Sequence, residues 1–99
     1  MAENNITLVF RKTVTNLAGN RLGNEVFCDQ VKDKIDENKL NIVVFPMVIE
    51  DIASSFIEGF YKNLAEKYGK DRALHIMQLR AEHPDSARKI SDSIRTYGV

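Results

Sequence analysis

The feature that most constrains the fold is an almost unbroken apolar segment in the middle of the chain. Leu40 to Ile49 reads Leu-Asn-Ile-Val-Val-Phe-Pro-Met-Val-Ile, and most of its residues are β-branched or otherwise apolar. Such a segment is typical of a central strand that is covered on both faces. Because proline lacks the backbone N–H that a sheet ladder requires, Pro46 predicts the end of this strand.

Helical periodicity begins directly after the strand. Apolar residues recur every three or four positions and would share one face of a helix: Ile52, Phe56, Ile57, Phe60, Leu64 and Tyr68. Gly69 suits the C-terminal cap, because glycine adopts positive φ angles without strain. The pattern predicts a helix from about Ser54 to Tyr68.

Two more strands and two more helices follow from the same reasoning. Asn5 to Lys12 and Ala73 to Leu79 have the composition of strands, and the stretch from Thr13 to Asn24 has that of a loop. A four-residue apolar period predicts a helix from Asn24 to near Asn38, and Pro84 suits the first turn of a last helix. That last helix has three apolar positions on one face: Ala87, Ile90 and Ile94.

The predicted order is therefore strand, helix, strand, helix, strand, helix. With 99 residues, 43% of them hydrophobic and 28% charged, the chain can build one core, so we expect a single domain over residues 1–99. Alternation favours a small α/β fold with a mainly parallel or mixed sheet and packed helices. Partners of such sheets usually meet the loops after the strands, here Pro46 to Ser55 and Arg80 to Asp85.

Charge and composition exclude several function classes. The formal net charge is zero, so the field of the whole molecule does not attract nucleic acid or anionic lipid. Residues 1–61 carry six Lys/Arg against nine Asp/Glu and residues 62–99 carry eight against five, a polarity that could steer a protein partner or bring copies together. A single cysteine and the absence of both a signal peptide and a run of about 20 apolar residues predict a cytosolic protein without a membrane span.

The polar turn between the central strand and the second helix holds the most informative side chains. Ser55 and Glu58 have the spacing of a capping box, in which each side chain satisfies a free amide at the helix start. Ser54 lies one residue earlier, where free N–H groups and the helix dipole would accommodate a phosphate. Such a phosphate would add close to two negative charges to a docking surface.

Other chemistry-bearing residues favour structural roles. The loop Gly19 to Asn24 contains Arg21 but has neither a dinucleotide fingerprint nor a P-loop, and a turn with Asn24 as a helix cap explains it. Cys28 lies beside an apolar helix face, where cysteine usually behaves as a small hydrophobe. His75 and His83 have no metal-ligand spacing to it. We therefore expect no metal site, no cofactor and no catalytic activity.

One family resemblance extends this interpretation. The apolar strand, the short acidic turn, Ile52-Ala53-Ser54-Ser55-Phe56 and the amphipathic helix resemble the STAS-like domains, small relatives of the anti-sigma factor antagonists. Leu17 to Arg21 is similar to the segment that leads into the family's first helix, and the likeness extends over most of residues 15–95.

The resemblance implies a regulatory module that binds a protein, with a GHKL-type ATPase or kinase as partner. In the anti-sigma factor antagonists a serine at the start of this helix is phosphorylated and binding is switched off, and Ser54 is the matching position. The expected binding surface comprises Ser54, Ser55, Phe56 and Glu58, with Arg21 beside them. Two alternatives remain: a small-molecule or nucleotide-binding module that uses the same loops, and a subunit that self-associates through Asn5 to Lys12.

Overall fold

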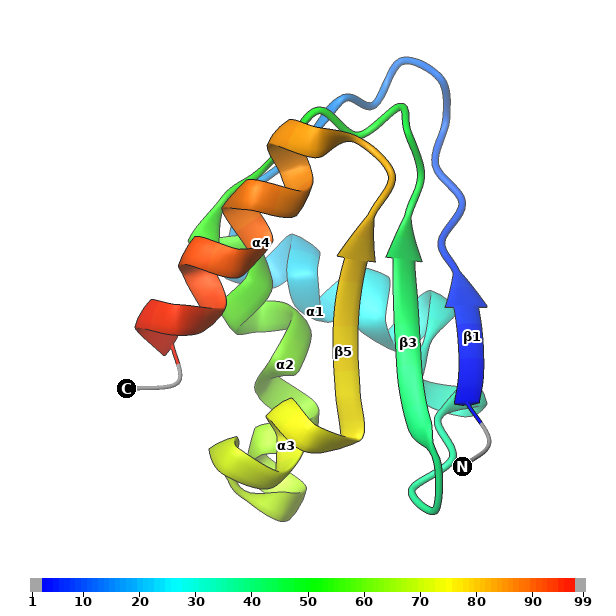
Figure 1. Cartoon of the computed structure of the whole chain (residues 1–99), viewed down its shortest axis with the longest axis vertical. Coiled ribbons are helices and arrows are strands. Elements are labelled where there is room, and N and C mark those ends of the chain that lie inside the picture. The colour runs from blue at the N-terminus through cyan, green and yellow to red at the C-terminus, as the bar shows by residue number, and fades with distance from the viewer. Residues whose placement is uncertain (1–2, 98–99) are drawn as a thin grey trace.

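A parallel three-stranded sheet forms the centre of the fold in the computed structural model, which describes residues 3–97 (Figure 1). The strand order is β1 (Glu3–Thr7), β3 (Leu40–Phe45) and β5 (Met77–Ala81), with β3 in the middle. Ile6, Val43 and Leu79 lie side by side on the buried face of the sheet. Helices cover this face, whereas no helix lies over the other face of the three strands in Figure 1.

The described residues contain four α-helices and a second, very short strand pair. The helices are α1 (Asn20–Gln30), α2 (Ser54–Tyr68), α3 (Lys70–Ile76) and α4 (Pro84–Tyr97), and a 3-10 turn, η1, covers Lys32–Lys34. The short strands β2 (Asn16–Leu17) and β4 (Asp51–Ile52) pair in parallel. The chain is therefore an α/β domain with a parallel sheet, as the alternating sequence pattern predicted.

Local chemistry sets several boundaries as predicted. The Leu8 N–H donates to the carbonyl oxygen of Val44 at 2.9 Å, and the next ladder donor would come from residue 46. That residue is Pro46, so the ladder between β1 and β3 stops there. This is why the central strand ends at Phe45, as Pro46 predicted. The first strand was predicted at Asn5 to Lys12 but covers Glu3–Thr7, because its ladder to β3 stops at the same proline.

Glycine and proline also mark the helix ends. Gly69 has φ 90° and forms the C-cap of α2, with its N–H donating to the carbonyl oxygen of Ala65 at 2.9 Å. Pro84 is the first residue of α4. The predicted bounds of α2, Ser54 to Tyr68, are confirmed.

Besides the first strand, two predicted elements differ from the structure. Ala73 to Leu79 is not one strand, because α3 continues to Ile76 and the chain turns into β5 only at Met77. Helical spacing places Ala73 and Ile76 in the core, and strand alternation then buries Met77 and Leu79. The apolar residues of this segment therefore follow the helical period first and the strand period afterwards.

The first helix is also displaced from its predicted range of Asn24 to Asn38. It begins at Asn20 and ends at Gln30, so the expected loop is shortened and Asn24 is not a helix cap. Gly19, with φ 97°, forms the N-cap. Gly23 lies inside the helix because that position has room only for hydrogen: a Cβ there would be 2.1 Å from the carbonyl oxygen of Phe56.

The order of elements repeats within the first two thirds of the chain, with β1, β2 and α1 followed by β3, β4 and α2. In each half a strand of the main sheet leads through a bend and a two-residue strand into a helix. Gly59 of α2 lies against the backbone of Asn20, and Gly23 of α1 against that of Phe56, so the two helices cross in close contact. The Gly19 N–H contacts Ser55 Oγ and Cys28 contacts Asn63, so the two helices begin side by side and stay in contact further along.

Candidate functional site

The bend before α2 is anchored to the core but keeps a polar outer side. Ile49 and Ile52 are fully buried, whereas Glu50 and Asp51 are exposed. The buried Ser86 hydroxyl of α4 donates to the carbonyl oxygen of Ile49 at 2.7 Å. The bend is thus a fixed support from which α2 begins, and its carboxylates face solvent.

Ser54 is the first residue of α2, and it is exposed. The residue before it, Ala53, is extended (φ −76°, ψ 151°), and its N–H donates to the carbonyl oxygen of Leu17 at 2.8 Å. Neither a capping side chain nor an acidic residue occupies the first turn of α2. The positive end of the helix dipole therefore meets solvent at Ser54.

Ser55 does not form the predicted capping box with Glu58. Its Oγ accepts a hydrogen bond from the N–H of Gly19 at 3.0 Å, which ties the start of α2 to the start of α1. The hydroxyl reaches Gly19 because the two helices begin side by side. The local Ser-x-x-Glu spacing does not predict this contact between distant segments. Ser55 is half-buried, so its role is to hold the two helix starts together.

Phe56 lies beneath this surface and not on it. Its side chain is fully buried, its ring stacks on Phe60 at 5.6 Å between centroids, and it meets Phe45 edge-on at 6.0 Å. Phe56 is therefore a core residue that supports the start of α2, and a docked partner cannot reach it without unfolding the helix.

Glu58 and Arg21 are both exposed, on α2 and α1 respectively. Burial, together with the charge of the Glu58 carboxylate, raises the pKa of Tyr97, which places Glu58 near the end of α4. Arg21 lies in the first turn of α1 and pairs with Glu25 at 3.1 Å, a pair so exposed that it stabilises little. The structure thus brings Arg21 and Ser54 to the neighbouring starts of two helices.

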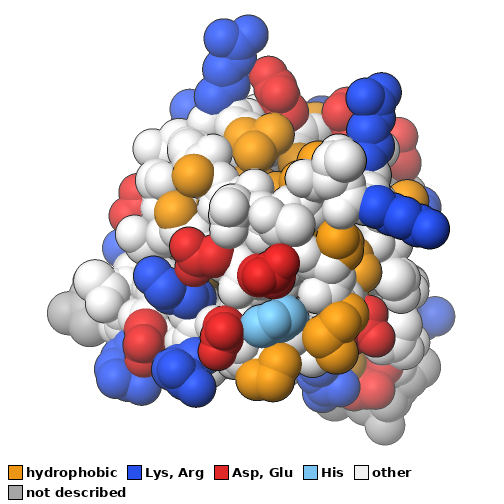
Figure 2. All heavy atoms as spheres, turned by 90° about the horizontal axis from the view of Figure 1, so that it is seen from above, with side chains coloured by type: hydrophobic (Ala, Val, Ile, Leu, Met, Phe, Trp, Pro, Cys, Tyr) orange, Lys and Arg blue, Asp and Glu red, His pale blue; other side chains and the backbone are white. Residues whose placement is uncertain are grey.

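The structure adds neighbours that the sequence does not reveal. Lys89 of α4 lies 3.7 Å from the carboxylate of Asp51, across 38 residues of chain. The two residues help to line an open depression of about 520 Å³ beside the bend, together with Asn16, Glu50, Asp85, Arg88 and Asp92. Figure 2, which looks onto the carboxyl ends of the strands, shows hydrophobic side chains exposed among acidic and basic ones. Met47, in the bend, is 56% exposed.

Residues with nucleophilic or metal-binding chemistry do not gather at this site. Cys28, which was expected to behave as a small hydrophobe beside the apolar helix face, is exposed, and its Sγ accepts a hydrogen bond from the Asn63 side chain at 3.3 Å. His75 lies on α3, not in a strand, and His83 caps α4 by accepting the N–H of Asp85 at 3.1 Å. Within residues 3–97 no three His, Cys, Asp or Glu side chains form a metal-binding group.

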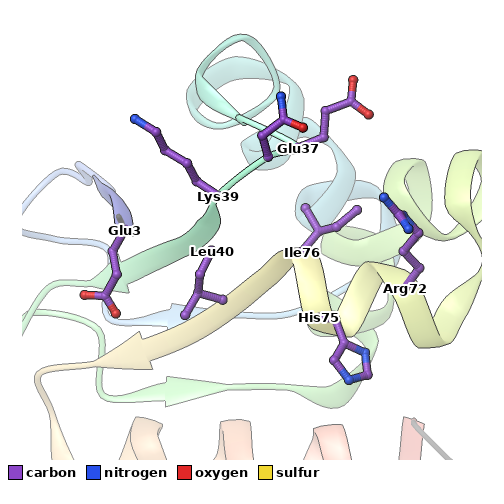
Figure 3. A pocket seen from close by; sticks show the side chains of 8 residues that line it. Glu3, Glu37, Lys39, Leu40, Arg72, His75 and Ile76 are labelled. Atoms are coloured by element: carbon purple, nitrogen blue, oxygen red, sulfur yellow. The ribbon is translucent and has the colours of Figure 1, made fainter. Parts of the chain in front are cut away.

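A second open depression, of about 470 Å³, lies at the opposite end of the sheet. Glu3, Leu40 and His75 are among the residues that line it, and in Figure 3 their side chains extend to one side of the sheet while Lys39 extends away. Its charged groups do not converge on one point, so the geometry does not define a ligand position.

Comparisons with protein-family models, with curated proteins and with solved structures give no match to this chain. As for the membrane, none of the helices within residues 3–97 combines the length and the apolar character that spanning a bilayer requires.

Proposed function

We propose that this chain is a STAS-like interaction module that binds a protein partner at the start of α2. The proposed α2-start surface comprises Glu50, Asp51, Ser54, Glu58 and Arg21. The observation that carries the proposal is the exposed, uncapped start of α2, which follows the bend and the short strand β4 that come after the carboxyl end of the central strand. In parallel sheets this end is the usual place for ligands and partners.

Phosphorylation of Ser54 would act as the switch. The first-turn amides and the helix dipole favour a phosphate at this position while the protein is free. In the complex the same phosphate would be a desolvated dianion inside the contact area, so it would oppose docking. A kinase-like ATPase of the GHKL class is the partner that the STAS-like resemblance suggests. Ser55, engaged with Gly19, is the poorer acceptor.

The test compares two aspartate variants of exposed serines. Ser54→Asp places a charge on the α2-start surface, whereas Ser91→Asp places the same charge on the exposed side of α4. The wild-type chain, used as bait in its native cell, should retain a partner that mass spectrometry identifies, together with any phosphate on Ser54. We expect the affinity of Ser54→Asp for that partner to be at least tenfold lower than that of Ser91→Asp, which corresponds to a loss of about 1.4 kcal/mol of binding free energy. Equal retention by the two variants would refute the proposal.

A small-molecule or nucleotide-binding function remains the second candidate, supported by the mixed-charge depression beside the bend. Isothermal titration of the wild-type chain with a nucleotide panel separates the two, because a module that binds only protein gives no heat. Saturable heat that Lys89→Ala abolishes would favour the nucleotide.

A further inference from the structure

The outer edge of β1 carries backbone groups that no strand satisfies within residues 3–97. β1 pairs only with β3, and Figure 1 shows it at the border of the sheet. In a parallel ladder, successive residues direct their N–H and C=O groups to opposite sides. The Leu8 N–H bonds to Val44, and Asn4 and Ile6 share its side of the strand, so the outward groups belong to Glu3, Asn5 and Thr7.

The open edge ends at a definite residue. Val9 is the next residue with outward groups, and the side chain of Gln30 occupies both of them: its Oε1 accepts the Val9 N–H at 2.8 Å and its Nε2 donates to the Val9 carbonyl oxygen at 2.9 Å. The amide of Gln30 thus imitates a neighbouring strand for one residue. It leaves a window of three outward residues with Asn5 at its centre.

This window is complementary to itself when a second copy approaches in the antiparallel direction. With a two-fold axis at Asn5, the Asn5 residues of the two copies face each other, and Glu3 of each copy faces Thr7 of the other. The three residue pairs would exchange about six backbone hydrogen bonds. A register centred on Thr7 would need the groups of Val9, which Gln30 already occupies.

Charge selects the same direction. The segment begins with the acidic Glu3 and is followed by the exposed, basic Arg11 and Lys12. The antiparallel register places Glu3 opposite the uncharged Thr7, whereas a parallel in-register arrangement would place the Glu3 side chains of the two copies together, and Arg11 and Lys12 lie beyond the window. No two like charges oppose each other across the three-residue window.

We infer that β1 is a self-association site, at which two copies of this chain join antiparallel into one six-stranded sheet. We assign a second copy as the partner because the window matches itself: its three outward residues, centred on Asn5, pair with the same three residues of an identical strand without opposing like charges. This inference is independent of the proposed α2-start surface, which consists of other residues.

Sedimentation equilibrium of the full 99-residue chain over a concentration series tests the inference. Wild type should pass from monomer to dimer, with a dissociation constant below about 1 mM. Asn5→Pro removes an outward N–H from each copy but leaves the ladder to β3 intact, so we expect the dissociation constant to rise at least tenfold. Asn5→Ala is the matched control, since it keeps the N–H, and it should stay within about threefold of wild type.

A second substitution guards against local unfolding by the proline. Asn5→Lys leaves the backbone unchanged and places two lysines opposite each other at the axis, so it should also weaken the dimer, and added salt should partly restore it. Circular dichroism of each variant verifies the fold. A wild-type chain that stays monomeric up to about 1 mM, or a dimer that both variants leave unchanged, would overturn the inference.

Discussion

The close crossing of α1 and α2 makes a sharp prediction for Gly59→Ala. A Cβ at residue 59 would lie 2.0 Å from the carbonyl oxygen of Asn20, where ordinary contact begins at 3.4 Å. The obstacle is backbone, which cannot rotate away, so the two helices must separate by about 1.4 Å, the difference between these distances. The separation also loosens the edge-on contact between Phe27 and Phe60, whose centroids lie 5.7 Å apart.

The magnitude follows from two opposing effects of this substitution. Overpacking of a core costs about 1–3 kcal/mol, and a clash with backbone belongs at the upper end. Alanine gains about 1 kcal/mol over glycine from helix propensity. We expect the free energy of unfolding to fall by about 2 kcal/mol, which for a domain of this size lowers Tm by about 10 °C.

Urea denaturation, monitored by circular dichroism, measures the change in the free energy of unfolding. The sign of this change decides between the two effects. Ala65→Gly, in the same helix, is the control and should destabilise the protein by about 1 kcal/mol through helix propensity. If propensity were the only effect at residue 59 as well, Gly59→Ala would stabilise the protein by the same amount. A Gly59→Ala protein as stable as wild type, or more stable, would show that the helices are not in contact at this glycine.

Two further predictions concern the support of the bend and a buried phenol. Ser86→Ala removes the hydroxyl that donates to the Ile49 carbonyl oxygen, and we expect the free energy of unfolding to fall by about 1–3 kcal/mol. Amide hydrogen exchange in the bend should also become faster, and unchanged exchange would contradict this prediction. Burial, and next the charge of Tyr97, raises the pKa of Tyr61 above its ordinary value of 10.0. The unfolded chain therefore ionises first, so the stability due to Tyr61 is full below about pH 10 and is lost as the pH rises further. Between about pH 8 and 11 the Tm of Tyr61→Phe should therefore fall less steeply than the Tm of wild type. Parallel curves of Tm against pH for the two proteins would refute the argument.

Features that act within a few residues were readable from the sequence. Pro46, Gly69 and Pro84 mark boundaries because each changes what its own backbone can donate or which φ it adopts. The apolar period of α2 was equally clear, since one helix face must meet the core whatever lies opposite. The alternation of strands and helices then predicted an α/β domain, and the exposed Ser54 lies at the helix start where the sequence placed it.

Features that depend on which segments become neighbours could not be read in this way. Ser55 was expected to cap its own helix but accepts the amide of Gly19, because α1 begins beside α2. Phe56 was expected on the surface and is in the core, since the helix turns that face toward Phe45.

The same holds for the edge of β1 and for the third strand. Gln30 closes one end of the edge from 21 residues away, and the ladder stops because a proline on another strand offers no donor. Ala73 to Leu79 is apolar enough for either structure, and the fold divides it into α3, which packs against α2, and β5, which pairs with β3. Local chemistry thus determined the elements and their ends, whereas the tertiary structure decided which side chains reach solvent, because burial depends on contacts between distant segments.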